Sequence, residues 1–142
     1  MIDEAALRDL VAAFNAHDLD RIMEFFTDDC VLEAPRGAEP WGTRYSGKAA
    51  VREGFAARFA GIPDVHYGED EHWAWGDHAV SRWLLTGTST SGEKVRVHGC
   101  DLFDLEDGRI RRKDSYWTSA WPGTSRRRRC RRPGRSARRP PG

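Results

Sequence analysis

Hydrophobic residues recur at helical spacing in three stretches of the chain. Residues 4–16 carry apolar side chains at i, i+3, i+4 and i+7, which makes one face of an amphipathic helix that Asp3 is suited to cap. Asp18 is suited to cap a second helix, which residues 27–29 end, and Ser46 a third helix over residues 48–60. The first half of the chain is therefore predicted to be mainly helical.

Alternating apolar and polar positions dominate the rest of the chain. Runs over residues 65–75, 78–88 and 95–117 are separated or divided by Gly-containing turns, as in a series of β-hairpins. A short strand over residues 30–34 is predicted to end at Pro35, before a loop around Trp41. Helices followed by a four-stranded antiparallel meander indicate an α+β fold, in which a curved sheet closes on the helices.

One acidic residue lies on an apolar face of the last run. By the two-residue period of a strand, Asp101 shares its face with Val95, Val97, Gly99, Phe103 and Leu105. Burial of a carboxylate is unfavourable unless the group is paired or protonated. Asp101 is therefore the candidate catalytic residue of the chain.

Two strand registers give Asp101 different neighbours. A two-residue turn at Asp107-Gly108 places Asp101 opposite Asp114, whereas a three-residue loop places it opposite Lys113, with Ser115 and Trp117 on the same face. We favour the second register because opposite charges across a strand pair stabilise it. An ion pair of this kind would keep Asp101 ionised.

The charge of the chain is unevenly distributed. Nine of the 23 basic residues are arginines between Arg126 and Arg139, so 14 basic residues remain against 22 acidic ones. The negative body argues against nucleic acid as its partner, and only the tail could bind it non-specifically. Residues 120–142, rich in Arg, Pro and Gly, are predicted to be disordered.

Cysteine count and hydropathy indicate a cytoplasmic protein. Cys30, Cys100 and Cys130 are odd in number and match no disulfide or zinc spacing, and no run approaches the length of a transmembrane segment. His66, His72 and His78 are spaced six residues apart, which does not match a zinc motif, so no metal and no cofactor is expected.

The order of elements and several sequence stretches resemble the SnoaL-like branch of the nuclear transport factor 2-like superfamily. These stretches are FNAHDLDRIMEFFTDDCVLEAP, YSGKAAVREGF, WLLTGT and GCDLFDLEDGRIRRKDSYW. The resemblance covers residues 4–117 and implies a domain over residues 1–119. Its expected structure is a cone-shaped barrel, in which a curved antiparallel sheet wraps on N-terminal helices around an internal pocket, in a homodimer.

Comparison with ketosteroid isomerase within that superfamily assigns the site. Asp101 aligns with the isomerase acid, and Trp117 with a residue of the pocket wall. Arg82 is turned inward as a second partner for Asp101. The positions of the oxyanion tyrosine and of the general base fall on Phe14 and Ala34, so that mechanism is incomplete here.

The resemblance implies a protein that binds a small, apolar, ring-containing compound. Asp101 would transfer a proton in cofactor-free isomerisation, cyclisation or dehydration, and six residues would bind the compound: Phe14, Trp41, Arg82, Phe103, Lys113 and Trp117. The alternative is a non-catalytic ligand-binding or dimerisation module, which the two missing isomerase groups favour.

Overall fold

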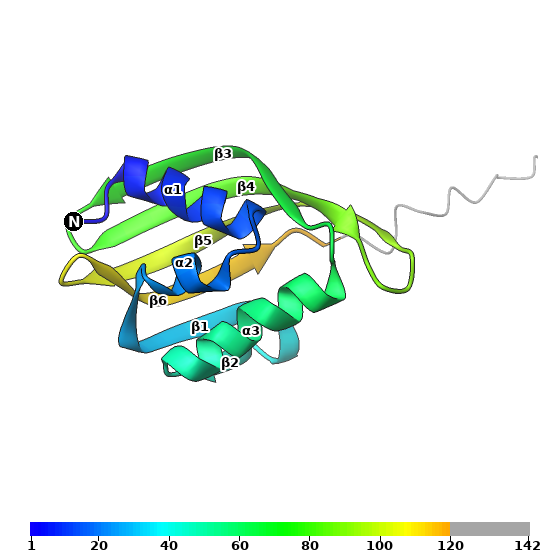
Figure 1. Ribbon diagram of the computed structural model, residues 1–142, viewed down its shortest axis with the longest axis horizontal. Helices are drawn as coiled ribbons and strands as arrows, with labels where there is room; N and C mark the ends of the chain where they lie inside the picture. Colours follow the sequence, from blue (N-terminus) through cyan, green and yellow to red (C-terminus); the bar gives the residue numbers. More distant parts are fainter. Residues whose placement is uncertain (120–142) are drawn as a thin grey trace, which may run out of the picture.

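A six-stranded sheet covered on one side by three helices forms the body of the protein. The computed structural model describes residues 1–119, with helices α1 (Glu4–Asn15), α2 (Leu19–Met23) and α3 (Lys48–Gly61). The strands are β1 (Phe26–Glu39), β2 (Gly42–Ser46), β3 (His66–Trp75), β4 (His78–Thr88), β5 (Lys94–Glu106) and β6 (Arg109–Trp117). All three helices lie on the same side of the curved sheet (Figure 1).

The sheet has the order β2-β1-β6-β5-β4-β3 and stays open, with β2 and β3 as its edges in the described part of the chain. The antiparallel meander of β3 to β6 confirms the prediction. β1 extends it by pairing in parallel with β6, through Phe26 with Ile110 and Val31 with Arg112. Since the helices lie over the inner face, the α+β prediction is confirmed, although the sheet is not a closed barrel.

The helix starts follow local sequence, with one exception. The carboxylate of Asp3 accepts a hydrogen bond from the backbone N–H of Ala6 at 2.8 Å, and Asp18 does the same for Arg21 at 3.1 Å. The expectation that Ser46 caps α3 was wrong. Gly47, at φ 87°, precedes α3, and its N–H donates to the carbonyl of Cys30 at 2.8 Å.

The segment around Pro35 differs from the prediction of a short strand and a loop. β1 starts already at Phe26 and continues through Pro35, and β2 pairs with it as a hairpin. The register shifts between Ala34 and Glu39, so Pro35, which has no N–H, lies in the irregular part of the ladder. A proline at the margin of the sheet is therefore tolerated.

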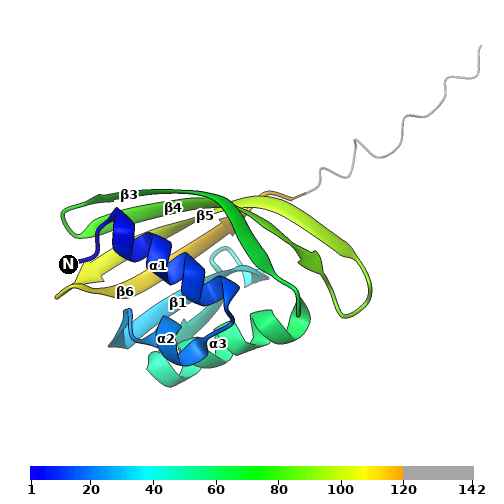
Figure 2. The same ribbon diagram turned by 45° about the horizontal axis from the view of Figure 1, so that its top comes forward.

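The helices lie against the inner face of the sheet (Figure 2), and residues of both form the hydrophobic core. α1 packs over β3 and α3 over β1. The largest fully buried side chains include Leu7, Ile22, Phe26, Val51, Trp83 and Ile110. Ile110 of β6 is fully buried in this core, whereas Leu102 and Tyr116 are exposed.

Candidate functional site

An extra residue in β6 sets the surroundings of Asp101. The hairpin has the two-residue turn, with Glu106 paired to Arg109, but the register shifts after Leu105 and leaves Arg111 as the extra residue. Asp101 consequently lies opposite Ser115, which neither predicted register gives. Its face nevertheless carries Lys113, Ser115 and Trp117, as the favoured register expected.

The Asp101 carboxylate is buried and accepts hydrogen bonds from three side chains. Lys113 Nζ donates to Oδ1 at 2.8 Å and Ser115 Oγ donates to the same oxygen at 2.6 Å. Trp83 Nε1 donates to Oδ2 at 2.8 Å. Asp101 is 5% exposed and Lys113 7%, so this is an ion pair largely removed from water. Three donors around both oxygens suit the ionised carboxylate.

The Lys113 ammonium group bridges this pair to an aromatic wall. Besides Asp101, it donates to Ser115 Oγ at 2.7 Å. Its Nζ lies 5.6 Å from the ring centre of Phe14 and 5.8 Å from that of Phe55. An ammonium group has three N–H donors, so one donor remains beyond these two hydrogen bonds.

Trp83 is a further member of the site, through its hydrogen bond to Asp101. Its indole is 2% exposed and lies against Gly99 of β5. A Cβ at Gly99 would come within 2.3 Å of the Trp83 ring. Glycine at this position therefore lets the indole lie flat enough on β5 to reach Asp101.

A cavity begins at this cluster. Its volume is only about 10 Å³. That is room for about one water molecule. The lining residues are Leu10, Val11, Phe14, Tyr67, Ser81, Trp83, Asp101, Phe103 and Lys113.

Tyr67 adds a phenol hydroxyl to the mostly apolar lining. Burial raises the pKa of its hydroxyl above the usual value, an effect that Arg58 opposes and Asp101 reinforces. The hydroxyl is therefore protonated at neutral pH and able to donate a hydrogen bond into the cavity. Tyr67 lies in the strand predicted over residues 65–75, but the sequence pattern did not indicate that it belongs to the site.

A second compartment lies between the cavity and an open groove. It has a volume of about 30 Å³ and shares Phe14, Tyr67, Trp83 and Lys113 with the first. Arg58 and Trp117 line both this compartment and a groove of about 740 Å³. The Arg58 guanidinium lies 4.3 Å from the Trp117 ring centre, so the two side chains form the wall between cavity and groove.

Two predicted binding residues lie away from Asp101. Arg82 is exposed and pairs with Cys100 on the outer face, because Ser81 and Trp83 occupy the inward positions of β4. The prediction that Arg82 points inward was wrong, because its two neighbours in the strand point inward and Arg82 points outward. Trp41 is 42% exposed in the β1–β2 hairpin, where Arg44 covers its ring at 4.5 Å.

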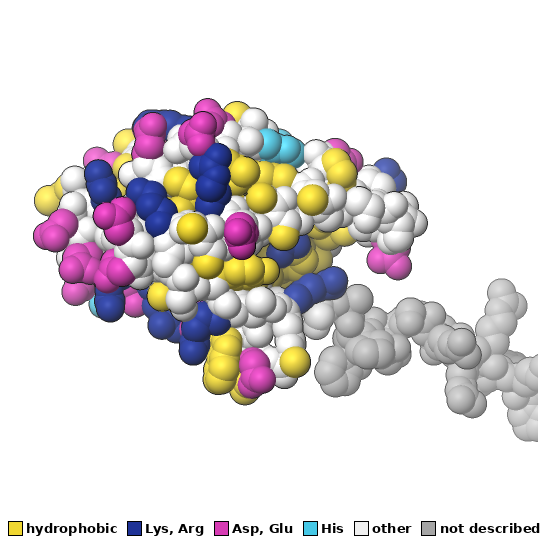
Figure 3. Space-filling model, turned by 60° about the horizontal axis from the view of Figure 1, so that its bottom comes forward, with side chains coloured by type: hydrophobic (Ala, Val, Ile, Leu, Met, Phe, Trp, Pro, Cys, Tyr) yellow, Lys and Arg dark blue, Asp and Glu magenta, His cyan; other side chains and the backbone are white. Residues whose placement is uncertain are grey.

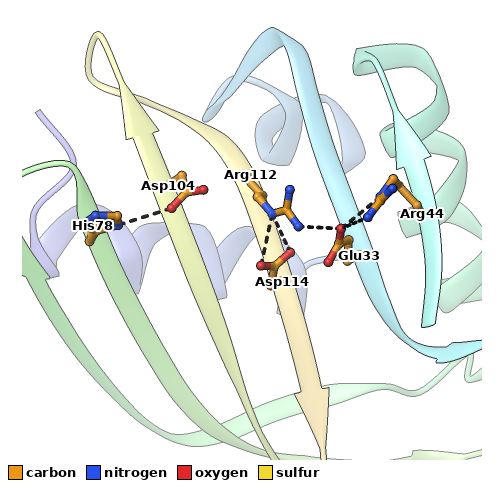
Figure 4. A network of polar contacts seen from close by, with 6 residues as sticks. All are labelled: Glu33, Arg44, His78, Asp104, Arg112 and Asp114. Carbon is orange, nitrogen blue, oxygen red and sulfur yellow. Dashed lines mark hydrogen bonds and ion pairs between the residues drawn. The ribbon is translucent and has the colours of Figure 1, made fainter. Parts of the chain in front are cut away.

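The outer face of the sheet carries a separate polar network (Figure 4). Arg44 and Arg112 both donate to Glu33, at 2.8 and 2.6 Å, and Arg112 Nε also binds Asp114 at 3.0 Å. Burial would raise the pKa of Glu33, but the two arginines hold it below its usual value. Burial, reinforced by the Glu33 carboxylate, raises the pKa of Asp114 against the effect of Arg112.

The histidines are distributed over both faces. His98 is exposed on the face opposite Asp101. His66 and His78 are exposed, whereas His72 is buried. Within residues 1–119 no group of three potential ligands is arranged to hold a metal ion, and no helix there is long and apolar enough to span a membrane. The predicted tail and Cys130 lie outside the described residues.

The fold and parts of the sequence match known proteins. A model of the SnoaL-like domain family matches residues 7–113. A candidate polyketide cyclase from Xanthomonas campestris is 20% identical, with 79% of this chain and 87% of that chain covered and a TM-score of 0.70. A candidate isomerase from Bacillus subtilis is 23% identical, with 79% and 83% covered and a TM-score of 0.65.

A third structure is closer in sequence. A nuclear transport factor 2-like protein of unknown function from Mesorhizobium loti is 28% identical, with 80% of this chain and 88% of that chain covered and a TM-score of 0.66. Each comparison covers most of both chains. The relatives therefore share the whole described domain rather than a single motif.

Proposed function

The chain belongs to the SnoaL-like domain family, and we propose that it binds a small, apolar, ring-containing compound next to Asp101 and catalyses cofactor-free acid/base chemistry on it. The proposed reaction is an isomerisation, cyclisation or dehydration. The observation that carries this proposal is a carboxylate–ammonium pair at the wall of a cavity whose other surfaces are largely aromatic and aliphatic.

The polar groups of the cavity have complementary roles. Lys113, with one donor remaining, and the protonated Tyr67 hydroxyl would polarise a carbonyl or hydroxyl oxygen of the compound. The Asp101 carboxylate would accept the proton that this polarisation makes acidic. Phe14, Phe103 and Trp117 would contact the ring, since Phe14 lines both compartments, Phe103 the first and Trp117 the second.

Entry of a ring requires the cavity to widen. Space for about one water molecule cannot hold a six-membered ring. The Trp117 and Arg58 side chains separate the inner compartments from the groove, so their rotation is the shortest way to enlarge the cavity. Proteins with this fold include a candidate polyketide cyclase and a candidate isomerase, which supports acid/base chemistry on ring compounds.

A non-catalytic binding module is the second candidate. The isomerase tyrosine and general-base positions are Phe14 and Ala34 here, and all three donors around Asp101 come from the protein itself. Such a protein would bind the same ring compounds without removing a proton from them. The two candidates are therefore separated by proton exchange and not by binding.

The test is solvent exchange at the carbon next to a carbonyl. Small ring ketones (cyclohexanone, 1-indanone and 2-tetralone) are incubated with the protein in D₂O, and loss of the α-proton signal is followed by NMR. We expect exchange above the buffer rate, reduced by about 100-fold in Asp101→Asn. Asp114→Asn and His98→Gln, on the outer face, are the controls and should exchange like the wild type.

Two results would overturn the proposal. Ketones that stabilise the protein against heat but exchange no faster than in buffer would favour the binding module. Equal exchange by wild type and Asp101→Asn would place the chemistry elsewhere. All measurements are made well below the melting temperature of each variant, so that loss of folded protein does not imitate loss of activity.

A further inference from the structure

A hydrogen-bonded chain of three side chains runs from the surface to the cavity beside Asp101. Asp70 Oδ2 lies 2.6 Å from His72 Nε2, and His72 Nδ1 lies 2.7 Å from Ser81 Oγ. The His72 side chain is 1% exposed, whereas the Asp70 side chain is 29% exposed and reaches water. Ser81 is 2% exposed and lines the same cavity as Asp101, its partner across β4 and β5.

A bulge in β3 turns His72 toward this cavity. The register between β3 and β4 shifts between Gly68 and Glu71, so one extra residue lies opposite Trp83. Had the upstream register continued, His72 would have faced outward and away from Ser81. Glu69 adopts φ 51° in the bulge, a left-handed conformation that is unfavourable for glutamate. Bulges and strained residues of this kind concentrate at functional sites.

The partners define the proton positions in the chain. An ionised carboxylate only accepts, so His72 Nε2 carries the proton that it shares with Asp70. In the neutral ring Nδ1 is then the acceptor, and Ser81 donates its hydroxyl proton to it. A serine hydroxyl polarised in this way can pass a proton on when it receives one.

We propose that Asp70, His72 and Ser81 form a proton relay between the cavity and solvent, which acts as a second acid/base group beside Asp101. A bound compound gives a proton from its hydroxyl or enol to Ser81 Oγ while the Ser81 hydroxyl proton moves to His72 Nδ1. The resulting imidazolium is stabilised by the Asp70 carboxylate, to which it passes its Nε2 proton, and Asp70 releases that proton to water. The reverse sequence protonates the compound, and no oxidant or other reactant is needed.

The relay would act together with Asp101. Its proton transfer to or from a ligand rests on the proposed function. Cyclisation and dehydration need one group that takes a proton from carbon and another that exchanges a proton with oxygen. Asp101 would be the first and Ser81 the second. Ser81 is then a catalytic residue, while His72 and Asp70 act through it as positioning residues. The substrate class narrows to ring compounds that carry both a carbonyl and a hydroxyl or enol oxygen.

The first experiment needs no ligand. Protein labelled with ¹⁵N-histidine is used to measure how fast the His72 Nε2 proton exchanges with water, in wild type and in Asp70→Asn. Asparagine can still accept the hydrogen bond but cannot carry a proton. A relay predicts exchange at least about tenfold slower in Asp70→Asn, whereas a purely structural hydrogen bond predicts equal or faster exchange, because the bond to asparagine is weaker.

His17 is the internal control for this measurement. Its Nε2 lies 3.0 Å from the backbone carbonyl of Val65, which has no route for passing a proton on. The His17 exchange rate should therefore be the same in wild type and Asp70→Asn. Unchanged or faster exchange at His72 would overturn the relay.

The second experiment uses turnover of the ring-ketone panel extended with 2-hydroxycyclohexanone. Ser81→Ala should lower kcat for the hydroxyketone by about 100-fold and leave KM unchanged, since the hydroxyl acts in proton transfer and not in binding. Equal kcat values for wild type and Ser81→Ala would show that the relay exchanges no proton with the ligand. The two proposals can fail separately. If His72 exchanges slowly in Asp70→Asn but ketone exchange does not depend on Asp101, the relay is supported and the proposed function is contradicted.

Discussion

Asp101 and Lys113 stabilise each other at the expense of their contact with water. Both residues are less than a tenth exposed, and their charged atoms are 2.8 Å apart. Replacing one member of a buried ion pair leaves the other charge without compensation, which costs about 3–5 kcal/mol. Loss of one member of this pair therefore affects stability more than loss of one member of an exposed ion pair would.

Asp101→Asn should lower the free energy of unfolding by about 3 kcal/mol. The Lys113 charge would lose its counter-ion, and the asparagine amide could not satisfy Lys113, Ser115 and Trp83 together. Asp101→Asn/Lys113→Met should lose less than the sum of the two single variants in urea denaturation. Additive losses would mean that the two side chains do not interact appreciably.

Glu33 gives the protein a pH-dependent contribution to stability. Its folded pKa is lower than the usual 4.5, so the contribution is complete above that value and is lost as the pH falls through the folded pKa. Asp114, with a raised pKa, opposes this because its folded form binds a proton more readily. We therefore expect a shallow net loss of stability on acidification.

Glu33→Gln should be less stable than wild type at about pH 6, and the difference should shrink by about pH 3.5, as urea denaturation at both values will show. Glu24→Gln is the matched control. Its carboxylate also pairs with an arginine, Arg21 at 2.6 Å, but is 63% exposed. A difference between wild type and Glu33→Gln that stays constant over this pH range would contradict the role of the Glu33 carboxylate.

Single residues of the site differ in how far the sequence predicts them. Asp101 was identifiable because strand alternation places it among apolar residues, and a charge in such a position needs a partner. The Asp70–His72–Ser81 chain could not be identified from the sequence, because it depends on the strained backbone of Glu69. Glutamate has no particular preference for that conformation, so nothing in its identity signals the bulge.

At the scale of elements, pattern and turn residues predicted the meander well. The glycine turns at Gly76, Gly92 and Gly108 have positive φ, as the hairpins require. β2 was missed because its residues have little alternation, and its pairing with β1 depends on tertiary packing. The exact pairing of Asp101 was likewise not predictable, since an irregular residue within a strand leaves no clear sequence signal.

Gly99→Ala should disturb β4 and β5 together and lower the free energy of unfolding by about 1–3 kcal/mol. The added Cβ would lie 2.3 Å from the Trp83 ring and 2.6 Å from the Tyr116 carbonyl oxygen. The indole must move and loses its hydrogen bond to Asp101, which near-ultraviolet circular dichroism should detect.

Gly61→Ala is the matched control for this variant. Gly61 ends α3, and a Cβ there would meet no atom within 4 Å. Stability should be unchanged or slightly higher, because alanine favours the helix. Equal stability of Gly99→Ala and wild type would show that the Trp83 indole is not held in place by close contact with β5.

At the scale of the whole molecule, the outer face of the sheet is partly apolar. Leu102 and Tyr116 are 43% and 55% exposed, and Cys100 lies opposite Tyr116 on this face. Figure 3 shows another view of the surface, in which hydrophobic side chains are exposed among basic and acidic ones. The resemblance implies a homodimer, and the outer face is the candidate contact between two copies.

The expected result is a dimer in light scattering at tens of micromolar, which Leu102→Glu converts to a monomer. A charge at the centre of the contact would be buried without a partner. Trp75→Glu, at an equally exposed position near the β3–β4 turn, is the control and should remain dimeric. A monomeric wild type would exclude a stable dimer, and dissociation only in Trp75→Glu would move the contact to the sheet edge.

The extra residue in β6 also bears on how this protein tolerates changes in chain length during evolution. In a regular strand, loss of one codon exchanges the faces of every residue beyond it. Loss of Arg111 would instead give a plain ladder in which Asp104 still meets Arg112 and Lys113 still faces Asp101. Deletion of Arg111 would therefore leave the surroundings of Asp101 intact. A deletion a few residues later in β6 would turn the side chains beyond it to the opposite face of the sheet.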